Sequence, residues 1–292
     1  MNHSQLSRRH FTQLSLFAGT GLLTGAARGN GITARQVVER IQSELAKQGI
    51  VWRAQTVDTF KAGNPDTRVK GIATTFMATL DVLQRAAAAG KNFVITHEPT
   101  FWNHLDATQD FTADSLYQHK LNFIQQHEMI VWRFHDHIHA RKPDTVFLGL
   151  VKRMGWERFM TGTNTRRFVL PETTLGALAS NVGRKLQSPS VRVIGDPQLK
   201  VTRIANASHS LDANIAALND NDVILVGEAR EWDTAEYLRD LVALGHKKGM
   251  ILIAHQTWEE WGMEDCALWL RTFVPEVASE WIPSGEPFWT LS

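Results

Sequence analysis

The stretch GIATTFMATLDVLQRAAAAGKNFVITHE, residues 71–98, carries the pattern that decides the fold. Its first part is typical of a strand, its middle of a helix, and its last part of a second strand. The same alternation continues to the end of the chain. Further strands are expected at 129–135, 191–195, 201–207, 222–228, 250–255 and 280–282, and further helices over about 114–127, 145–155, 172–186, 232–246 and 258–272. Strands separated by helices predict an α/β fold, with sheets flanked by helices.

Two capping boxes and one possible seam organise this pattern. Thr33 and Gln36 have the spacing of a capping box and open an amphipathic helix that ends near Gly49. Thr257 and Glu260 repeat the spacing, which predicts that Thr257 is the N-cap of the last long helix and leaves Glu259 free to face His255. The polar stretch near 187–200 contains two prolines and predicts a seam between two lobes.

The first 27 residues have the features of an export signal. Ser7-Arg8-Arg9-His10-Phe11 resembles the twin-arginine signal, and Ala26-Ala27 is a plausible cleavage neighbourhood. The apolar run after it is about 14 residues, shorter than the roughly 20 that a membrane span needs. We therefore interpret residues 1–27 as a signal peptide, 28–292 as the two-lobed domain, and the location as periplasmic or exported by the twin-arginine route.

Composition excludes several classes of function. A formal net charge of +1 over 292 residues argues against a nucleic-acid binder, which needs a concentrated basic surface. The single cysteine excludes an internal disulfide and a cysteine-rich zinc site. Any metal centre must therefore be built from histidine, aspartate and glutamate.

Three predicted strands end in residues that can bind metals. Ligands gather beyond the carboxyl ends of strands in α/β sheets, so these three ends are expected to meet. The residues are His97 and Glu98 in the first; His135, Asp136, His137 and His139 in the second; His255, Glu259 and Glu260 in the third.

The local conformation at each end decides which side chains converge. Neighbours in an extended chain project to opposite sides, so His97 and Glu98 are expected to serve two adjacent ions rather than chelate one. If the second strand continues, its three histidines share a face. If the chain turns helical, His135 and His139 still meet at positions i and i+4. His139 is thus the more robust ligand candidate; His135 and Asp136 are expected to orient the ligands from behind, and His137 is a bystander.

These motifs resemble those of the Nif-three-like family of dinuclear metal-centre proteins, some of which carry the label of a type-two GTP cyclohydrolase. The family has THHP, HTNLDA and GHYATE motifs; the matching stretches here are 96–99, 135–140 and 254–259. Glu98 stands where the family has a histidine and His139 where it has an aspartate, so the donor set keeps three imidazoles and two carboxylates. The ligands that the resemblance implies are His97, Glu98, His139, His255 and Glu259.

The resemblance implies a two-lobed fold and a centre of two divalent transition-metal ions. Zn, Mn, Fe or Co suit imidazole donors. Two ions bridged by Glu259 and a water imply hydrolysis of a small-molecule substrate, with Glu259 as the catalytic residue. The family also implies a homo-oligomer, with a hexamer as its form. No P-loop, G-x-S-x-G or dinucleotide fingerprint identifies the substrate, and GTP is not expected for an exported protein.

Two other readings stay open at this point. One is a protein that binds metal for storage, delivery or regulation without turnover. The other is a mononuclear site on His97, His255 and Glu259.

Tryptophans and one further histidine lie near the motifs. The tryptophans either wall a substrate pocket or pack the core. They are Trp102, Trp132, Trp258 and Trp261, and His209 and Ser210 are expected to line a pocket.

Overall fold

The stretch that predicted strand, helix and strand folds in that order. It forms β2 (Ile72–Thr75), α2 (Leu80–Ala88) and β3 (Phe93–Thr96) in the computed structural model, which describes residues 31–291. β2 and β3 pair in parallel, and every residue of both strands is buried. Burial on both faces explains why these strands read as continuous apolar runs rather than as alternating patterns.

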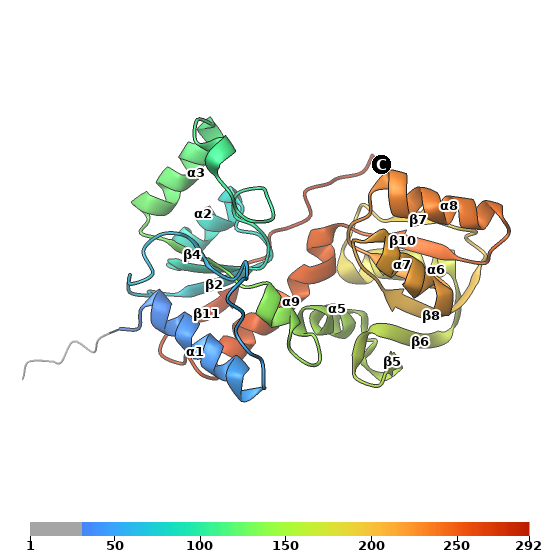
Figure 1. The fold of residues 1–292 in the computed structure, drawn as a ribbon, viewed down its shortest axis with the longest axis horizontal. Coiled ribbons are helices and arrows are strands. Elements are labelled where there is room, and N and C mark those ends of the chain that lie inside the picture. Colours follow the sequence, from blue (N-terminus) through green and yellow to red (C-terminus); the bar gives the residue numbers. More distant parts are fainter. Residues whose placement is uncertain (1–30, 292) are drawn as a thin grey trace, which may run out of the picture. The chain divides into compact units, whose positions relative to one another are not determined.

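A five-stranded sheet is built around this unit (Figure 1). Its order is β1-β4-β3-β2-β11, and all pairs are parallel except that of β1 (Phe60–Ala62) with β4 (Ile130–Arg133). α2 and α3 (Ser115–Gln126) cover one face, while α1 (Ala34–Lys47) and α9 (His255–Leu270) cover the other. The predicted capping box of α1 is confirmed: Thr33 accepts from the backbone of Gln36, and the Gln36 side chain accepts from the backbone of Thr33.

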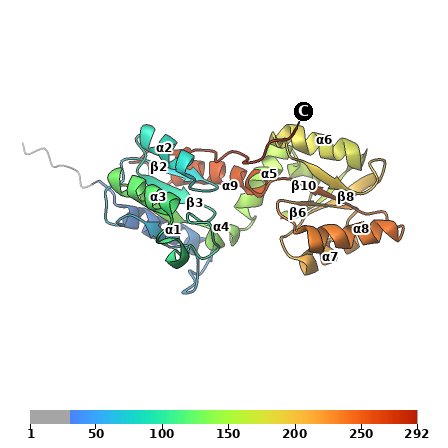
Figure 2. The same cartoon turned by 90° about the horizontal axis from the view of Figure 1, so that it is seen from above.

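A six-stranded sheet forms the other half of the fold. Its order is β5-β6-β8-β9-β10-β7, of which β8-β9 and β9-β10 are parallel pairs. α5 (Thr145–Met154), α6 (Leu175–Leu186) and part of α9 pack on one face, and α7 (Leu211–Asp220) and α8 (Glu236–Ala243) on the other (Figure 2). The strands are β5 (Met160–Thr161), β6 (Asn164–Thr174), β7 (Arg192–Ile194), β8 (Lys200–Asn206), β9 (Val223–Val226) and β10 (Gly249–Leu252).

The chain crosses from the first sheet to the second and back, and its tail, residues 283–291, then returns to the second half, where Glu286 accepts from Ser188. It leaves the first through the short helix α4 (Asp136–His139) and α5, and it returns through α9 to β11 (Ser279–Trp281). A Cβ atom on Gly262 of α9 would lie 2.4 Å from the Cα of Val146, and one on Gly149 of α5 would lie 2.4 Å from the backbone of Trp261. These glycines therefore allow the two crossing helices to touch backbone to backbone.

Two expectations from the sequence differ from the structure: the position of the seam between the lobes and the start of the last long helix. Residues 187–200 contain β7, which pairs with β10 inside the six-stranded sheet, so the crossing lies at α4–α5 and at α9 instead. The predicted capping box at Thr257 is wrong, because α9 already begins at His255 with Ala254 as N-cap and no side-chain cap. Thr257 lies inside the helix, and its hydroxyl lies within hydrogen-bonding distance of the side-chain oxygens of Gln256 and Glu286.

Within the described residues, no helix combines the length and the apolar character that crossing a membrane requires. The predicted signal peptide, residues 1–27, lies outside this part of the chain.

Candidate metal centre

The first candidate motif follows β3, where the chain bends at His97 and Glu98. His97 is fully buried; its Nδ1 donates to the carbonyl of Phe134 over 3.1 Å, and its Nε2 lies 3.2 Å from Oε2 of Glu259. The ligand atoms of His97, Glu98 and Glu259 all lie within 4.8 Å of one another. The expectation that His97 and Glu98 project to opposite sides is wrong, because the bend replaces the extended conformation on which it depended.

Arg133, the last residue of β4, is buried behind this motif. Its guanidinium donates to Oε2 of Glu98 at 2.9 Å and to the carbonyl of His97 at 3.0 Å. The other oxygen of Glu98 lies 3.6 Å from Nε2 of His135 and 3.8 Å from Nε2 of His255. A buried cation needs a partner, so Arg133 fixes one carboxylate oxygen and leaves the other facing the imidazoles.

The second motif turns helical after β4. α4 spans Asp136–His139. The ring centroids of His135 and His139 lie 5.1 Å apart, with an angle of 74° between the ring planes. The ring of His97 lies 4.7 Å from that of His135 and 4.9 Å from that of His139. Of the two conformations open from the sequence, the helical one is therefore present, and it brings both histidines to His97.

Asp58 holds this short helix in place, although no sequence pattern indicates this role. Its carboxylate accepts from the backbone N–H groups of residues 135, 136 and 137 at 2.7–2.9 Å, and from Nδ1 of His137 at 2.7 Å. Burial would raise the pKa of Asp58, but these hydrogen bonds lower it below its ordinary value. Nε2 of His137 accepts from the N–H of Arg53, and its ring stacks on Trp52, so His137 has no nitrogen left for a metal.

The third motif lies in the first turns of α9. Oε2 of Glu259 lies 3.1 Å from Nε2 of His255 and 3.2 Å from Nε2 of His97. Burial would raise the pKa of Glu259, but the hydrogen bonds from His255 and His97 hold it well below its usual value. Burial would lower the pKa of His255, but contacts with Glu228 and Glu259 raise it to about 10. Glu259 thus lies against Nε2 of both rings, and a metal ion that bound there would displace the protons in these contacts.

The four histidines of these motifs other than His137 share one arrangement. Each has an oxygen against Nδ1, which fixes the tautomer that leaves Nε2 for the centre. The partners are Phe134 O for His97 at 3.1 Å, Asp136 for His135 at 3.0 Å, Asp144 for His139 at 3.0 Å and Glu228 for His255 at 3.3 Å. Asp136 thus lies behind His135, the residue with which it was expected to orient the ligands, whereas the sequence analysis did not name Asp144 and Glu228.

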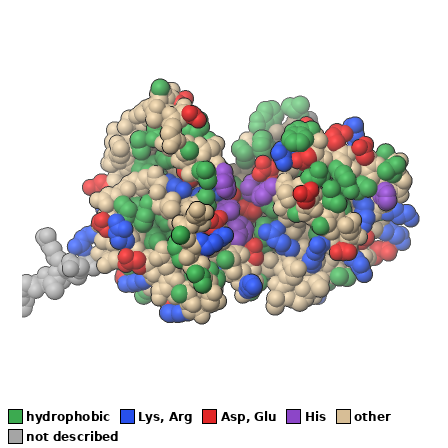
Figure 3. Space-filling model, in the orientation of Figure 1, with side chains coloured by type: hydrophobic (Ala, Val, Ile, Leu, Met, Phe, Trp, Pro, Cys, Tyr) green, Lys and Arg blue, Asp and Glu red, His purple; other side chains and the backbone are tan. Residues whose placement is uncertain are grey.

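The residues present could hold metal ions. Among the described residues, three groups have ligand atoms within 4.8 Å of one another: His97, His135 and His139; His97, Glu98 and Glu259; and His209, His255 and Glu259. His97 and Glu259 each belong to two of the groups. The donors are imidazole and carboxylate, which suit Zn, Mn, Fe and Co. Figure 3 shows histidine side chains gathered at the centre of this face, with carboxylates beside them.

Two cavities adjoin His255. One, of about 400 Å³, is lined by Phe76, Met77, Glu98 and the chain end with Phe288. The other, of about 580 Å³, is lined by Arg192, Glu228 and again His255 and Phe288. Both touch the candidate centre, and both have the size of a small-molecule site.

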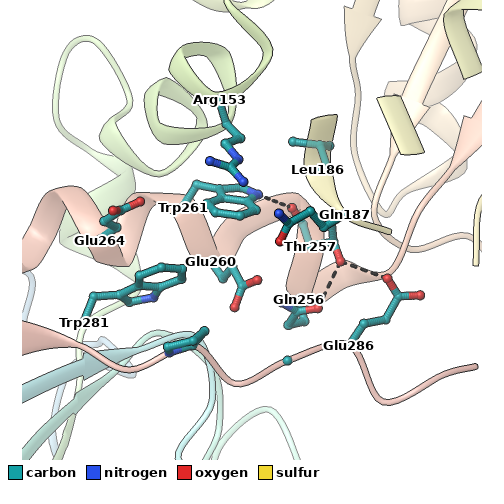
Figure 4. A pocket seen from close by; sticks show the side chains of 12 residues that line it. Arg153, Leu186, Gln187, Gln256, Thr257, Glu260, Trp261, Glu264, Trp281 and Glu286 are labelled. Carbon is teal, nitrogen blue, oxygen red and sulfur yellow. Dashed lines mark hydrogen bonds between the residues drawn. The ribbon is translucent and has the colours of Figure 1, made fainter. Parts of the chain in front are cut away.

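A third cavity, of about 390 Å³, lies against another face of α9 (Figure 4). Glu260 lines it rather than capping the helix, and its Oε2 is buried without a hydrogen-bond partner among the described residues. Burial raises the pKa of Glu260 above its ordinary value. No histidine lines this cavity, which shares Gln256 and Glu286 with the cavity beside Glu98 and His255.

The tryptophans near the motifs divide between the two expectations. Trp132 and Trp258 are almost fully buried and belong to the core clusters. Trp261 is a core residue too, but it also lines the cavity of Figure 4. Trp102 is 44% exposed and packs against Phe101 and Phe111. The core accounts for most of them.

Solved structures of other proteins share this fold. SA1388 of Staphylococcus aureus has 18% identity and a TM-score of 0.65, over 90% of this chain and all of that chain. A Bacillus cereus protein related to NIF3 has 13% identity and a TM-score of 0.68, over 89% of this chain and 99% of that chain. HcgD of Methanocaldococcus jannaschii has 16% identity and a TM-score of 0.60, over 86% of this chain and 97% of that chain. No curated protein matches the chain significantly.

The family model agrees with the fold. It matches residues 37–284, which span both sheets and all three candidate motifs. The chain belongs to the Duf34/NIF3 (NGG1p interacting factor 3) family.

Proposed function

We propose that this protein is an exported hydrolase with two divalent transition-metal ions, held by His97, Glu98, His139, His255 and Glu259. The observation that carries the proposal is the convergence of these three histidines and two glutamates in linked groups of ligand atoms, with an oxygen against Nδ1 of each histidine ring. Bound divalent ions supply an activated water near neutral pH and polarise the bond that is attacked.

The chain contributes the arrangement around that chemistry. Glu259 is 2% exposed and lies within 3.2 Å of both His97 and His255, so one carboxylate can serve two ligand groups. Its depressed pKa keeps it ionised at neutral pH. Glu98 is held from behind by Arg133 and cannot swing away. These contacts support pre-organisation of the centre.

The adjoining cavities support a substrate of small-molecule size with an apolar part. Phe76, Met77 and Phe288 line the cavity beside Glu98 and His255, so an apolar group bound there would leave its polar end at the centre. A homo-oligomer remains part of the proposal through the family alone.

The test begins with the metal content of the purified protein, measured by elemental analysis. We expect two ions per chain, followed by turnover of at least one member of a panel of phosphoesters, amides and cyclic amidines. Glu259→Gln should lower turnover by at least about 100-fold, the scale of a lost catalytic group. Glu264→Gln, on an exposed residue of the same helix, is the matched control and should change neither quantity.

Three results would decide against parts of the proposal. Two tightly held ions without turnover on any panel member would make the protein a metal binder for storage, delivery or regulation. Full turnover by Glu259→Gln would remove its catalytic role. Full metal content in both Glu98→Ala and His139→Ala would leave the mononuclear site on His97, His255 and Glu259.

A further inference from the structure

His209 lies at the candidate centre although it belongs to no motif that carried the family resemblance. It is in the loop between β8 and α7, on the six-stranded sheet. Its ring lies 4.9 Å from the ring of His255, and its edge meets Trp258 at 5.4 Å. Ligand atoms of His209, His255 and Glu259 all lie within 4.8 Å of one another.

Glu228 contacts the Nδ1 atoms of both His209 and His255. Its Oε2 lies 3.3 Å from Nδ1 of His255 and 3.6 Å from Nδ1 of His209. One carboxylate at the end of β9 thus faces the Nδ1 side of both rings, which leaves both Nε2 nitrogens for a cation. Two imidazoles beside an ionised carboxylate are a reasonable donor set for a transition metal.

The loop that carries His209 is fixed at several points. The N–H of Ala207 donates to Leu225 at 2.9 Å, and the N–H of Ser208 donates to the Asn214 side chain at 3.0 Å. Asn206, immediately before the loop, accepts from the indole of Trp258. His209 is therefore presented from an anchored backbone, although its own side chain is half exposed.

We propose that His209 is a ligand of the ion held by His255 and Glu259, so that this ion ties the loop after β8 to α9. The inference rests on the proposed metal centre but not on catalysis. The ion beside His97 and His139 would not depend on His209, since neither of those residues shares a ligand group with it.

Metal titration separates the two ions. Metal-free protein is titrated with Zn²⁺ in competition with a chromophoric chelator. We expect His209→Ala to weaken one of two bound ions by about tenfold or more, on the scale of disrupted ligand spheres, and to leave the other unchanged. His246→Ala, on an exposed histidine after α8, is the matched control and should bind both ions as the wild type does.

A cysteine in place of His209 gives a direct spectroscopic signature. In His209→Cys loaded with Co²⁺, a coordinated thiolate produces a charge-transfer band in the near ultraviolet that a distant thiol does not. The native Cys266 is buried, and burial raises its pKa to about 12, so wild-type protein with Co²⁺ should lack the band. The band in the variant supports coordination at position 209.

Unchanged affinity for both ions in His209→Ala, together with no band in His209→Cys, would overturn the inference. Two ions bound in the wild type, one of them lost in His209→Ala, would support it even if no substrate is ever turned over. A wild-type protein that binds no ion at all would overturn both this inference and the proposed function.

Discussion

At the scale of single residues, the candidate centre is defined as much by the groups behind the histidines as by the histidines themselves. Asp58, Arg133, Asp144 and Glu228 each hold a ligand candidate or the turn that presents it. Partners of this kind commonly change metal affinity by 10–100-fold when they are lost. Two predictions concern them.

Asp58→Ala should destabilise the protein strongly. The change leaves the N–H groups of residues 135–137 and Nδ1 of His137 without their acceptor in a buried place. The expected loss is about 3 kcal/mol of unfolding free energy, measured by urea denaturation of the metal-free protein. Asp66→Ala removes an exposed ion pair with Arg35 and should change the unfolding free energy far less. Similar losses in the two variants would contradict the role given to Asp58.

Replacing Glu98 by histidine and His139 by aspartate, the residue types of the family motifs, should reduce metal binding. Glu98→His leaves the buried Arg133 without its carboxylate, and His139→Asp places a new carboxylate at the contact with Asp144. The double variant keeps three imidazoles and two carboxylates among its five ligands. We still expect it to retain fewer than two ions by elemental analysis, because each exchanged side chain is matched to its own neighbour.

Recovery of both ions in the double variant would show that the count of charges is enough. Glu98→Gln is the useful comparison, since it keeps the size of the side chain and removes only the charge beside Arg133.

The sequence could predict which motif residues converge but not what fixes them. His97, His139, His255 and Glu259 follow recognisable strand ends and lie together. Asp58 lies 77–79 positions before the groups it binds, and a lone aspartate at that distance has no local pattern. Partners far apart in sequence are decided by tertiary packing, so only coordinates reveal them.

At the scale of elements, periodicity predicted most helices and strands and failed where the signals were short. β1, α4 and β5 have three, four and two residues, too few for a period. The false capping box at Thr257 had the right spacing, but α9 had already begun two residues earlier. His255 and Glu259 therefore meet as i and i+4 of one helix rather than across a strand end.

Helix α3 carries a buried lysine whose titration should be visible in the stability of the protein. Burial is the main cause that lowers the pKa of Lys120 to about 8 from 10.5, and the charge of Asp106 opposes it only in part. Between these pKa values the unfolded chain binds more protons than the folded chain, so this group makes the unfolding free energy rise with pH from about 8 to 10.5. The rise is on the order of 3 kcal/mol.

Lys120→Met should remove that rise. Unfolding free energies measured by denaturant at pH 7, 8.5 and 10 should vary less in the variant than in the wild type. Lys247→Met, on an exposed lysine, is the control and should follow the wild-type curve. An equally steep rise in Lys120→Met would contradict the assignment.

At the scale of the whole molecule, one prediction concerns export, because the proposed signal peptide lies outside the described residues. Arg8→Lys with Arg9→Lys should retain the protein inside the cell, because the twin-arginine route requires the arginine pair. The measurement is fractionation of the producing bacterium, followed by immunodetection. A substitution of the same type at Arg35, in the described part of the chain, should leave export unchanged. Normal export of the double lysine variant would contradict the proposed location.

The insertion of the second sheet into the sequence of the first has a consequence for which parts of such a protein can change in sequence. Residues 160–252, which contain the strands of the second sheet, are inserted in the sequence between β4 and β11 of the first sheet. The entry and exit of this segment run through α5 and α9, which touch at Gly149 and Gly262. Because these two connections lie side by side, the inserted segment can vary with little change to the first sheet, except at the tail after β11, where Glu286 accepts from Ser188. The half built on the first sheet would retain His97, Glu98, His135 and His139. A different inserted segment would bring other residues to the positions of His209 and Glu228.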